Sequence, residues 1–241
     1  MIIAQGVWKK FGSLYALRDV SFDIGQGQWV TLLGANGAGK TSLSRILAAL
    51  SRPSAGRACV AGLWVDEKPE QVREKIGVVS HHTLLYEDLS AVENLKFYAA
   101  MYRVRQADER IADLLNRIGL WTRRQDPVRT FSRGMQQRLA LTRAMLHEPS
   151  VLLLDEPFTG LDVHAGRLLT HFMEQAVQQN VTVFMTTHDV QYARDHSQRT
   201  LVLVQGRLCL NEESHQVAAG RVLDLLRETS PITIVPAVSQ S

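Results

Sequence analysis

One glycine-rich loop constrains this chain more than any other feature of its sequence. Residues 34–41 read Gly-Ala-Asn-Gly-Ala-Gly-Lys-Thr and fit the pattern G-x-x-x-x-G-K-[ST]. An apolar run at 29–33 precedes the loop, and a helix-type pattern at 42–47 follows it. This order predicts a strand, a tight turn and a helix start, where inward-pointing N–H groups and the positive end of the helix dipole bind phosphate. The loop therefore predicts a site for a nucleoside triphosphate.

Two residues at the end of this loop have distinct expected roles. The Lys40 ammonium is expected to reach the β- and γ-phosphates, and the Thr41 hydroxyl to bind Mg²⁺. The alternative, a glycine-rich turn with a chance lysine, is disfavoured by the flanking strand and helix patterns. The residues expected to contact the nucleotide are Gly34, Ala35, Asn36, Gly37, Ala38, Gly39, Lys40, Thr41 and Ser42.

Length and composition set limits on the other possibilities. A chain of 241 residues can form one large domain or a domain with an inserted lobe. Its net charge of +3 is mild, so no nucleic-acid partner is expected. Cys59 and Cys209 lie in unrelated apolar segments and are expected to be buried thiols in a reducing compartment. No signal peptide is visible and no apolar run approaches eighteen residues, so a cytoplasmic location is expected.

Alternating apolar segments predict an α/β core that is interrupted by a helical block. Strands are expected at 2–7, 16–24, 29–33, 57–65, 77–80, 151–154, 182–187, 201–204 and 208–210, and helices at 40–50, 69–76, 91–120, 163–179, 189–196 and 217–228. We expect a single domain at 1–230. Its α/β core comprises 1–80 and 150–215, its helical lobe 81–149 and its C-terminal helix 216–230, and a tail follows at 231–241.

The helical block is also basic. It carries eight Lys and Arg residues against four Asp and Glu residues between positions 96 and 130. A solvated helix face accounts for this charge, and so does a surface that faces a membrane or a partner. Both interpretations stay open from the sequence.

An acidic pair ends the buried strand expected at 151–154. Asp155 is expected to hold Mg²⁺, through a water molecule, because Mg²⁺ prefers carboxylate and water oxygens. Glu156 follows it and is expected to polarise an attacking water, which favours hydrolysis over transfer to another substrate. The alternative is an acidic pair that only caps the strand.

Phe11 is an aromatic residue beside the turn at Gly12 and Ser13, about two dozen residues before the phosphate loop. An aromatic ring there is suited to stack on an adenine base. The alternative is a core aromatic, and the residues alone do not decide between the two.

Three further segments resemble a known family. Residues 131–140, Phe-Ser-Arg-Gly-Met-Gln-Gln-Arg-Leu-Ala, resemble the L-S-G-G-Q-x-Q-R segment of ATP-binding cassette (ABC) ATPases. Residues 157–162 resemble the D-loop of that family, and residues 186–189 its switch-histidine segment. The resemblance extends over about residues 1–215 in the same order. It implies an α/β fold: a P-loop NTPase core with an antiparallel β subdomain and an inserted helical subdomain.

The resemblance also implies roles for individual residues. Glu156 becomes the general base, and His188 holds the γ-phosphate and the attacking water. Phe11 takes the position of the adenine-stacking aromatic. Ser132 and Gly134 open a helix that points at the γ-phosphate on another subunit, and Asp162 ends the D-loop segment.

The same resemblance implies how the chain assembles. Because the segment at Ser132 and Gly134 cannot reach its own phosphate loop in this fold, two copies sandwich two ATP molecules head to tail. The implied partners are a second ABC ATPase, with a homodimer expected, and an integral-membrane transporter subunit. The implied location is the cytoplasmic face of the cell membrane.

The sequence departs from the family pattern at three places. Arg133 and Met135 stand where the signature segment usually has Gly and Gln. The family's Gln between strand and helical lobe is absent, and its position is occupied by His81, followed by His82. Imidazole is a poor Mg²⁺ ligand, so His81 is expected to act near the nucleotide through water, or to leave the task to another group. A transition-metal or haem role for the histidine pair is a weaker alternative.

The variant signature segment, the histidine pair and the basic lobe resemble ATPases of ABC-2-type exporters. Within that group the resemblance leans towards the haem exporter ATPase of cytochrome c maturation. The alternatives are a non-transport ABC ATPase, such as one that assists iron–sulfur assembly, and the ATPase of a different ABC exporter or importer.

Overall fold

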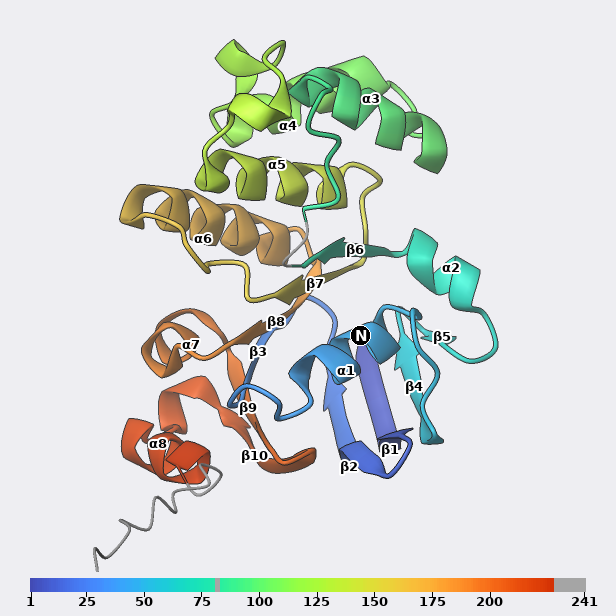
Figure 1. The fold of residues 1–241 in the computed structure, drawn as a ribbon, viewed down its shortest axis with the longest axis vertical. Helices are drawn as coiled ribbons and strands as arrows, with labels where there is room; N and C mark the ends of the chain where they lie inside the picture. Colours follow the sequence, from blue (N-terminus) through green and yellow to red (C-terminus); the bar gives the residue numbers. More distant parts are fainter. Residues whose placement is uncertain (81–82, 228–241) are drawn as a thin grey trace, which may run out of the picture.

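The computed structural model describes residues 1–80 and 83–227, which form two β-sheets covered by helices (Figure 1). A four-stranded antiparallel sheet has the order β2 (Leu14–Ile24), β1 (Ile2–Phe11), β4 (Ala55–Val60), β5 (Leu63–Trp64). A six-stranded sheet has the order β10 (Arg207–Glu213), β9 (Arg199–Val204), β3 (Trp29–Leu33), β8 (Thr182–Thr187), β7 (Val151–Asp155), β6 (Ile76–Val79). Its strands are parallel except for the edge strand β10.

The six-stranded sheet is buried on both faces, as parallel sheets generally are. Alternate residues of one strand therefore enter different cores: Leu153 belongs to the core between the two sheets, and Leu152 to the core on the opposite face. The core between the sheets encloses α1 (Lys40–Leu47), which buries Leu43 and Ile46. This packing fixes the start of α1 relative to the ends of the parallel strands.

The opposite face of the six-stranded sheet carries the helical part of the chain (Figure 1). Helices α6 (Val163–Gln178) and α5 (Arg133–Met145) pack on the sheet, α6 against β8 and α5 against β6, and α3 (Ala91–Tyr102) and α4 (Ala107–Arg117) lie beyond α5. The remaining helices are α2 (Pro69–Glu74), α7 (Val190–His196) and α8 (Ala219–Arg227), with 3₁₀ turns at Trp121–Arg123, Val128–Thr130 and Ser214–Gln216. No helix among the described residues combines the length and the apolar character needed to cross a bilayer.

The expected fold class is confirmed, while several element boundaries differ from the prediction. The strand expected at 57–65 is two strands, because the chain turns at Ala61 and Gly62 with positive φ. The helix expected at 91–120 divides into α3 and α4, because Arg103 and Gln106 adopt left-handed conformations. A bend of this kind leaves no trace in a continuous helical pattern of apolar residues.

The prediction for the two cysteines is half right. Cys59 is buried, whereas Cys209 is exposed. Cys209 lies on the outward face of β10, where it alternates with the buried Leu210. The histidine pair His81 and His82, the end of the expected C-terminal helix at 228–230 and the expected tail at 231–241 lie outside the described residues.

Candidate functional site

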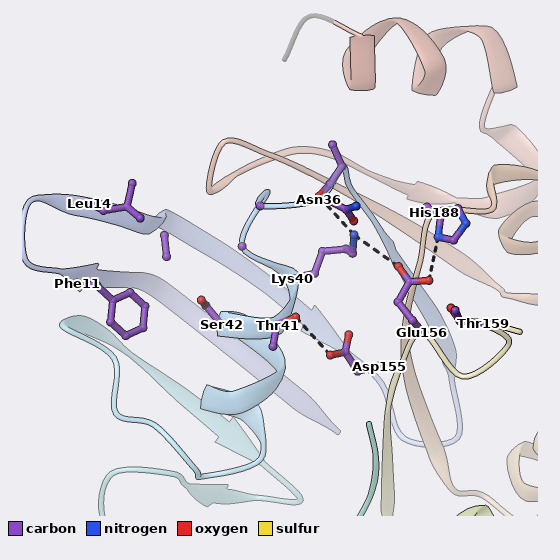
Figure 2. A pocket seen from close by; sticks show the side chains of 14 residues that line it. Phe11, Leu14, Asn36, Lys40, Thr41, Ser42, Asp155, Glu156, Thr159 and His188 are labelled. Atoms are coloured by element: carbon purple, nitrogen blue, oxygen red, sulfur yellow. Dashed lines mark hydrogen bonds and ion pairs between the residues drawn. The ribbon is translucent and has the colours of Figure 1, made fainter. Parts of the chain in front are cut away.

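The carboxyl ends of β3, β7 and β8 meet at one edge of the six-stranded sheet, which is where ligands bind in open α/β folds. The glycine-rich loop follows β3, Glu156 follows β7, and His188 follows β8. These segments line a cleft of about 730 Å³ (Figure 2). Its lining residues are Phe11, Leu14, Ala16, Ala35, Asn36, Gly37, Gly39, Lys40, Thr41, Ser42, Asp155, Glu156, Thr159 and His188.

The loop can turn this tightly only because of its glycines. Gly37 and Gly39 have φ values of 81° and 110°, which other residues rarely adopt. A Cβ atom at Gly39 would lie 2.3 Å from the Ala16 carbonyl oxygen, and one at Gly34 would lie 2.8 Å from the Leu203 carbonyl oxygen. The sequence therefore needs glycine at these two points for the loop to close over the start of α1.

Lys40 is the cation of the cleft. Its Nζ donates to the carbonyl oxygen of Gly34 at 2.5 Å and lies 3.4 Å from that of Ala35. It also forms an ion pair with Glu156, with 3.6 Å between Nζ and Oε1. Both side chains are largely buried, so the cation is placed and partly desolvated inside the loop, where phosphate oxygens would be bound.

Thr41 and Asp155 supply oxygen atoms to the same cleft. The Thr41 hydroxyl lies 3.3 Å from Asp155 Oδ2, and Thr186 donates its hydroxyl to Asp155 Oδ1 at 2.5 Å. A hydroxyl and a carboxylate side by side fit Mg²⁺, which takes oxygen ligands. The residues that would hold this ion are thus Thr41 and Asp155, and the ion would neutralise charge on the phosphates.

Glu156 occupies a strained backbone position. Its φ is 51°, and its N–H is held by the Thr186 carbonyl oxygen at 3.1 Å and the Thr186 hydroxyl at 3.2 Å. Its Oε2 lies 3.0 Å from Nδ1 of the exposed His188 (Figure 2). The carboxylate therefore stands between a lysine and a histidine, where a water molecule next to a phosphate could be deprotonated.

Phe11 lies at the end of the β1–β2 hairpin and is 54% exposed, so its interpretation as a core aromatic is wrong. The ring borders the cleft on the side away from Glu156 (Figure 2). Leu14 and Ala16 line the same region, and sequence reasoning missed both. Stacking of Phe11 on adenine stays a prediction that this position favours.

Thr159 also lines the cleft and was not singled out from the sequence as a site residue. It lies within the segment 157–162 that resembles the D-loop, and that resemblance is the sequence signal that could have identified it as a site residue. Together with Glu156 it lines a second groove, of about 750 Å³, which extends to Arg133 and Gln137 of α5. Glu156 therefore lies between the phosphate loop and the start of α5.

Among the described residues, five predicted site residues do not line the cleft: Gly34 and Ala38 of the loop itself, and Ser132, Gly134 and Asp162, which lie elsewhere. Ser132 caps α5 by accepting from the Met135 N–H at 3.3 Å, and Asp162 caps α6 by accepting from the Ala165 N–H at 2.8 Å. Gly134 packs against α6: a Cβ atom there would lie 3.0 Å from the Cβ of Ala165. The structure brings the last three residues next to each other but not to the phosphate loop.

Arg133 and Arg138 anchor the signature-like segment to its surroundings. The Arg133 side chain covers Gly160, where an added Cβ would lie 2.9 Å from its Nε. Arg138 donates to the Ile118 carbonyl oxygen at 2.6 Å. Burial lowers the pKa of the Arg138 guanidinium, and the nearby Asp162 opposes that shift. Arg133 thus packs on the segment 157–162 of its own chain.

Comparison with known proteins places these features in a family. Residues 17–159 match the model of the ABC transporter family. The chain is 35% identical over 205 residues to the uncharacterized ABC transporter ATP-binding protein YdbJ of Bacillus subtilis, covering 85% of this chain and 66% of that protein. It is 34% identical over 225 residues to the Nod factor export ATP-binding protein I of Rhizobium johnstonii, covering 92% of this chain and 70% of that protein. The chain therefore spans about two thirds of the length of these relatives.

A solved structure agrees with these relatives. It is a dimeric ATP-binding cassette in a post-hydrolysis state, bound to ADP and inorganic phosphate. It superimposes with a TM-score of 0.81 at 26% identity, covering 89% of this chain and 99% of that one.

Proposed function

The chain belongs to the ABC transporter family, and on that premise we propose that it is the ATP-hydrolysing subunit that powers an integral-membrane exporter. Cassettes of this family bind ATP with Mg²⁺ and hydrolyse it, so the chain is an ATPase. We propose that residues 1–230 form one nucleotide-binding domain in which 81–149 is the helical lobe.

One observation carries this proposal: the ends of three parallel strands bring Lys40, Asp155, Glu156 and His188 into a single cleft. The cleft holds a cation for phosphate, oxygen atoms for Mg²⁺ and a carboxylate for the attacking water. A site that only bound nucleotide would need the first two and not the third. The function that this set of groups supports best is phosphoryl transfer to water.

The position of the signature-like segment, which does not line the cleft, supports dimerisation. Ser132 and Gly134 lie at the start of α5, outside the cleft, although they match the part of the family that contacts the γ-phosphate. The solved ATP-binding cassette to which this chain is similar is a dimer. We therefore propose that two copies of this chain close head to tail over two ATP molecules, with Ser132 and Gly134 of each facing the phosphates of the other.

A membrane partner is supported by a patch on the helical lobe. Five large apolar residues there are each at least 40% exposed: Leu84, Tyr86, Phe97, Met101 and Tyr102. An exposed aromatic patch of this kind usually marks an interaction surface. We propose that an integral-membrane subunit docks on this aromatic patch, which places the chain at the cytoplasmic face of the membrane.

The cargo is a finer hypothesis. The Rhizobium relative is named for export of Nod factor, which supports export as the direction of transport. Haem export for cytochrome c maturation rests on the resemblance at 131–135, the pair His81 and His82 and the basic lobe. The rival interpretation, a non-transport ABC ATPase, needs no membrane partner and leaves the aromatic patch without a role.

Membrane co-fractionation separates the two interpretations. In cells that also express the genomic neighbours of this chain, we expect it to sediment with membranes and to purify in detergent with an integral protein. Phe97→Ser should reduce that retention and preserve ATPase activity. Leu223→Ser on α8 is the matched control, because Leu223 is 43% exposed and Phe97 is 41% exposed. A chain that stays unbound to membranes with full ATPase activity would favour the rival interpretation.

A further inference from the structure

Thr186 lies deep in the six-stranded sheet, directly behind the candidate catalytic carboxylates. It is on β8, where it is paired with Asp155 of β7 in the parallel register, and it has no exposed surface. Its hydroxyl donates to Asp155 Oδ1 at 2.5 Å and accepts from the Glu156 N–H at 3.2 Å. A threonine hydroxyl has one proton to give, so the two bonds fix its orientation: it accepts from the backbone and donates to the carboxylate.

Each of these bonds acts on one catalytic group. The bond to Oδ1 holds the Asp155 carboxylate so that Oδ2 is presented towards Thr41, 3.3 Å away. The bond from the Glu156 N–H adds to the one made by the Thr186 carbonyl oxygen, and both hold Glu156 at its φ of 51°. A non-glycine residue in that region is strained and persists only where its surroundings enforce it.

We propose that Thr186 is a positioning residue for hydrolysis: its hydroxyl orients Asp155 for Mg²⁺ and holds Glu156 at the attacking water. This inference rests on the proposed Mg²⁺–ATP site. It assigns the metal-ligand orientation to a fully buried hydroxyl of β8 that does not line the cleft. Groups that orient metal ligands in this way typically contribute 10–100-fold to metal affinity or activity.

The decisive variant is Thr186→Val, which keeps the shape of the side chain and removes the hydroxyl. Binding of a non-hydrolysable ATP analogue is measured at equilibrium with Mg²⁺ and with EDTA, so the readout does not depend on turnover. In the parent, Mg²⁺ should strengthen binding. We call the ratio of the affinity with Mg²⁺ to the affinity with EDTA the Mg²⁺ gain. In Thr186→Val the Mg²⁺ gain should shrink by about 10–100-fold while the affinity in EDTA stays the same. Thr186→Ser, which keeps the hydroxyl, should restore the gain to within a few-fold of the parent.

The chain provides a matched control in Thr31. Thr31 lies on the neighbouring strand β3 and is fully buried, and its hydroxyl has no hydrogen-bond partner within the described part of the chain. Thr31→Val therefore makes the same chemical change in the same sheet, and it should leave the Mg²⁺ gain intact. Equal weakening of binding with Mg²⁺ and with EDTA in Thr186→Val would overturn the proposal, because it would indicate a general packing role.

Three further outcomes are distinguishable. If Thr186→Val does not fold, Thr186→Cys replaces it: a weak S–H donor should give a smaller Mg²⁺ gain than Thr186→Ser, and equal gains would overturn the proposal. If the parent itself binds the analogue no better with Mg²⁺ than with EDTA, the proposed metal site is wrong and the role of Thr186 falls with it. A normal Mg²⁺ gain in a folded Thr186→Val would overturn the role of Thr186 alone.

Discussion

Glu156→Gln tests the proposed mechanism most directly, because it removes one charge from the centre of the site and keeps the shape of the side chain. The carboxylate that is lost lies 3.6 Å from Lys40 Nζ and 3.0 Å from His188 Nδ1. An amide cannot accept a proton from water at neutral pH, so the chemical step should slow. A positioned general base contributes about 10²–10⁴-fold. That corresponds to about 3–5 kcal/mol of activation free energy, because each tenfold change is about 1.4 kcal/mol.

Nucleotide binding should respond in the opposite sense. The Lys40–Glu156 pair has a Coulomb energy of about 4–5 kcal/mol at an effective dielectric constant of 20, before desolvation is counted. Removing the negative member takes away the carboxylate that competes with the phosphates for Lys40. We therefore expect ATP affinity that is equal to or higher than that of the parent, together with slow turnover. ATP that is bound and not hydrolysed should also accumulate a dimer, visible by size-exclusion chromatography.

The assay compares steady-state ATPase activity, equilibrium ATP binding and elution volume for the parent, for Glu156→Gln and for Glu174→Gln. Glu174 is the matched control, since it also faces a histidine, His196, at 3.8 Å, but lies on α6 outside the cleft. The control should behave like the parent in all three measurements. Turnover of Glu156→Gln within a few-fold of the parent would refute the assignment of Glu156 as the base.

Four other changes have defined outcomes. Lys40→Ala should abolish detectable ATP binding in equilibrium assays, because the cation for the β- and γ-phosphates is lost; retained binding would contradict the phosphate-loop assignment. Phe11→Ala should weaken ATP affinity by about 1–3 kcal/mol in the same assay, and an unchanged affinity would exclude stacking. His81→Gln should flatten the pH dependence of ATPase activity at about pH 6–7 relative to the parent measured in the same way; an identical profile would make His81 a bystander. Burial lowers the pKa of His147 below the ordinary 6.5, so its neutral form stabilises the fold above that value and stability should fall as the pH drops below it. His147→Gln should reduce this loss of thermal stability, and equal acid sensitivity would refute it.

Most of the phosphate-loop residues and the acidic pair that the sequence singled out line one cleft of the structure, because their sequence signal is local. Residues 34–41 form a continuous motif in which chain order determines geometry, and Asp155 and Glu156 end a strand whose apolar run marks it as buried. Thr186 could not be found in this way. Its role depends on the pairing of β8 with β7, which brings together residues 31 positions apart in the sequence. Long-range register of this kind is decided by the packing of the whole sheet and not by any local pattern.

The conformation of Glu156 shows why a rare backbone angle occurs at this point of the chain. Side chains on a strand alternate between its faces, so Asp155 lies on the side of Leu153, whose core encloses α1 and hence Thr41. Continued alternation would turn the next residue to the opposite face, towards the helical lobe. The left-handed turn at Glu156 instead brings its carboxylate to Lys40, while it still borders the groove beside α5. Both carboxylates thereby serve one cleft, and the backbone strain that this requires is opposed by the two bonds that its N–H donates to Thr186.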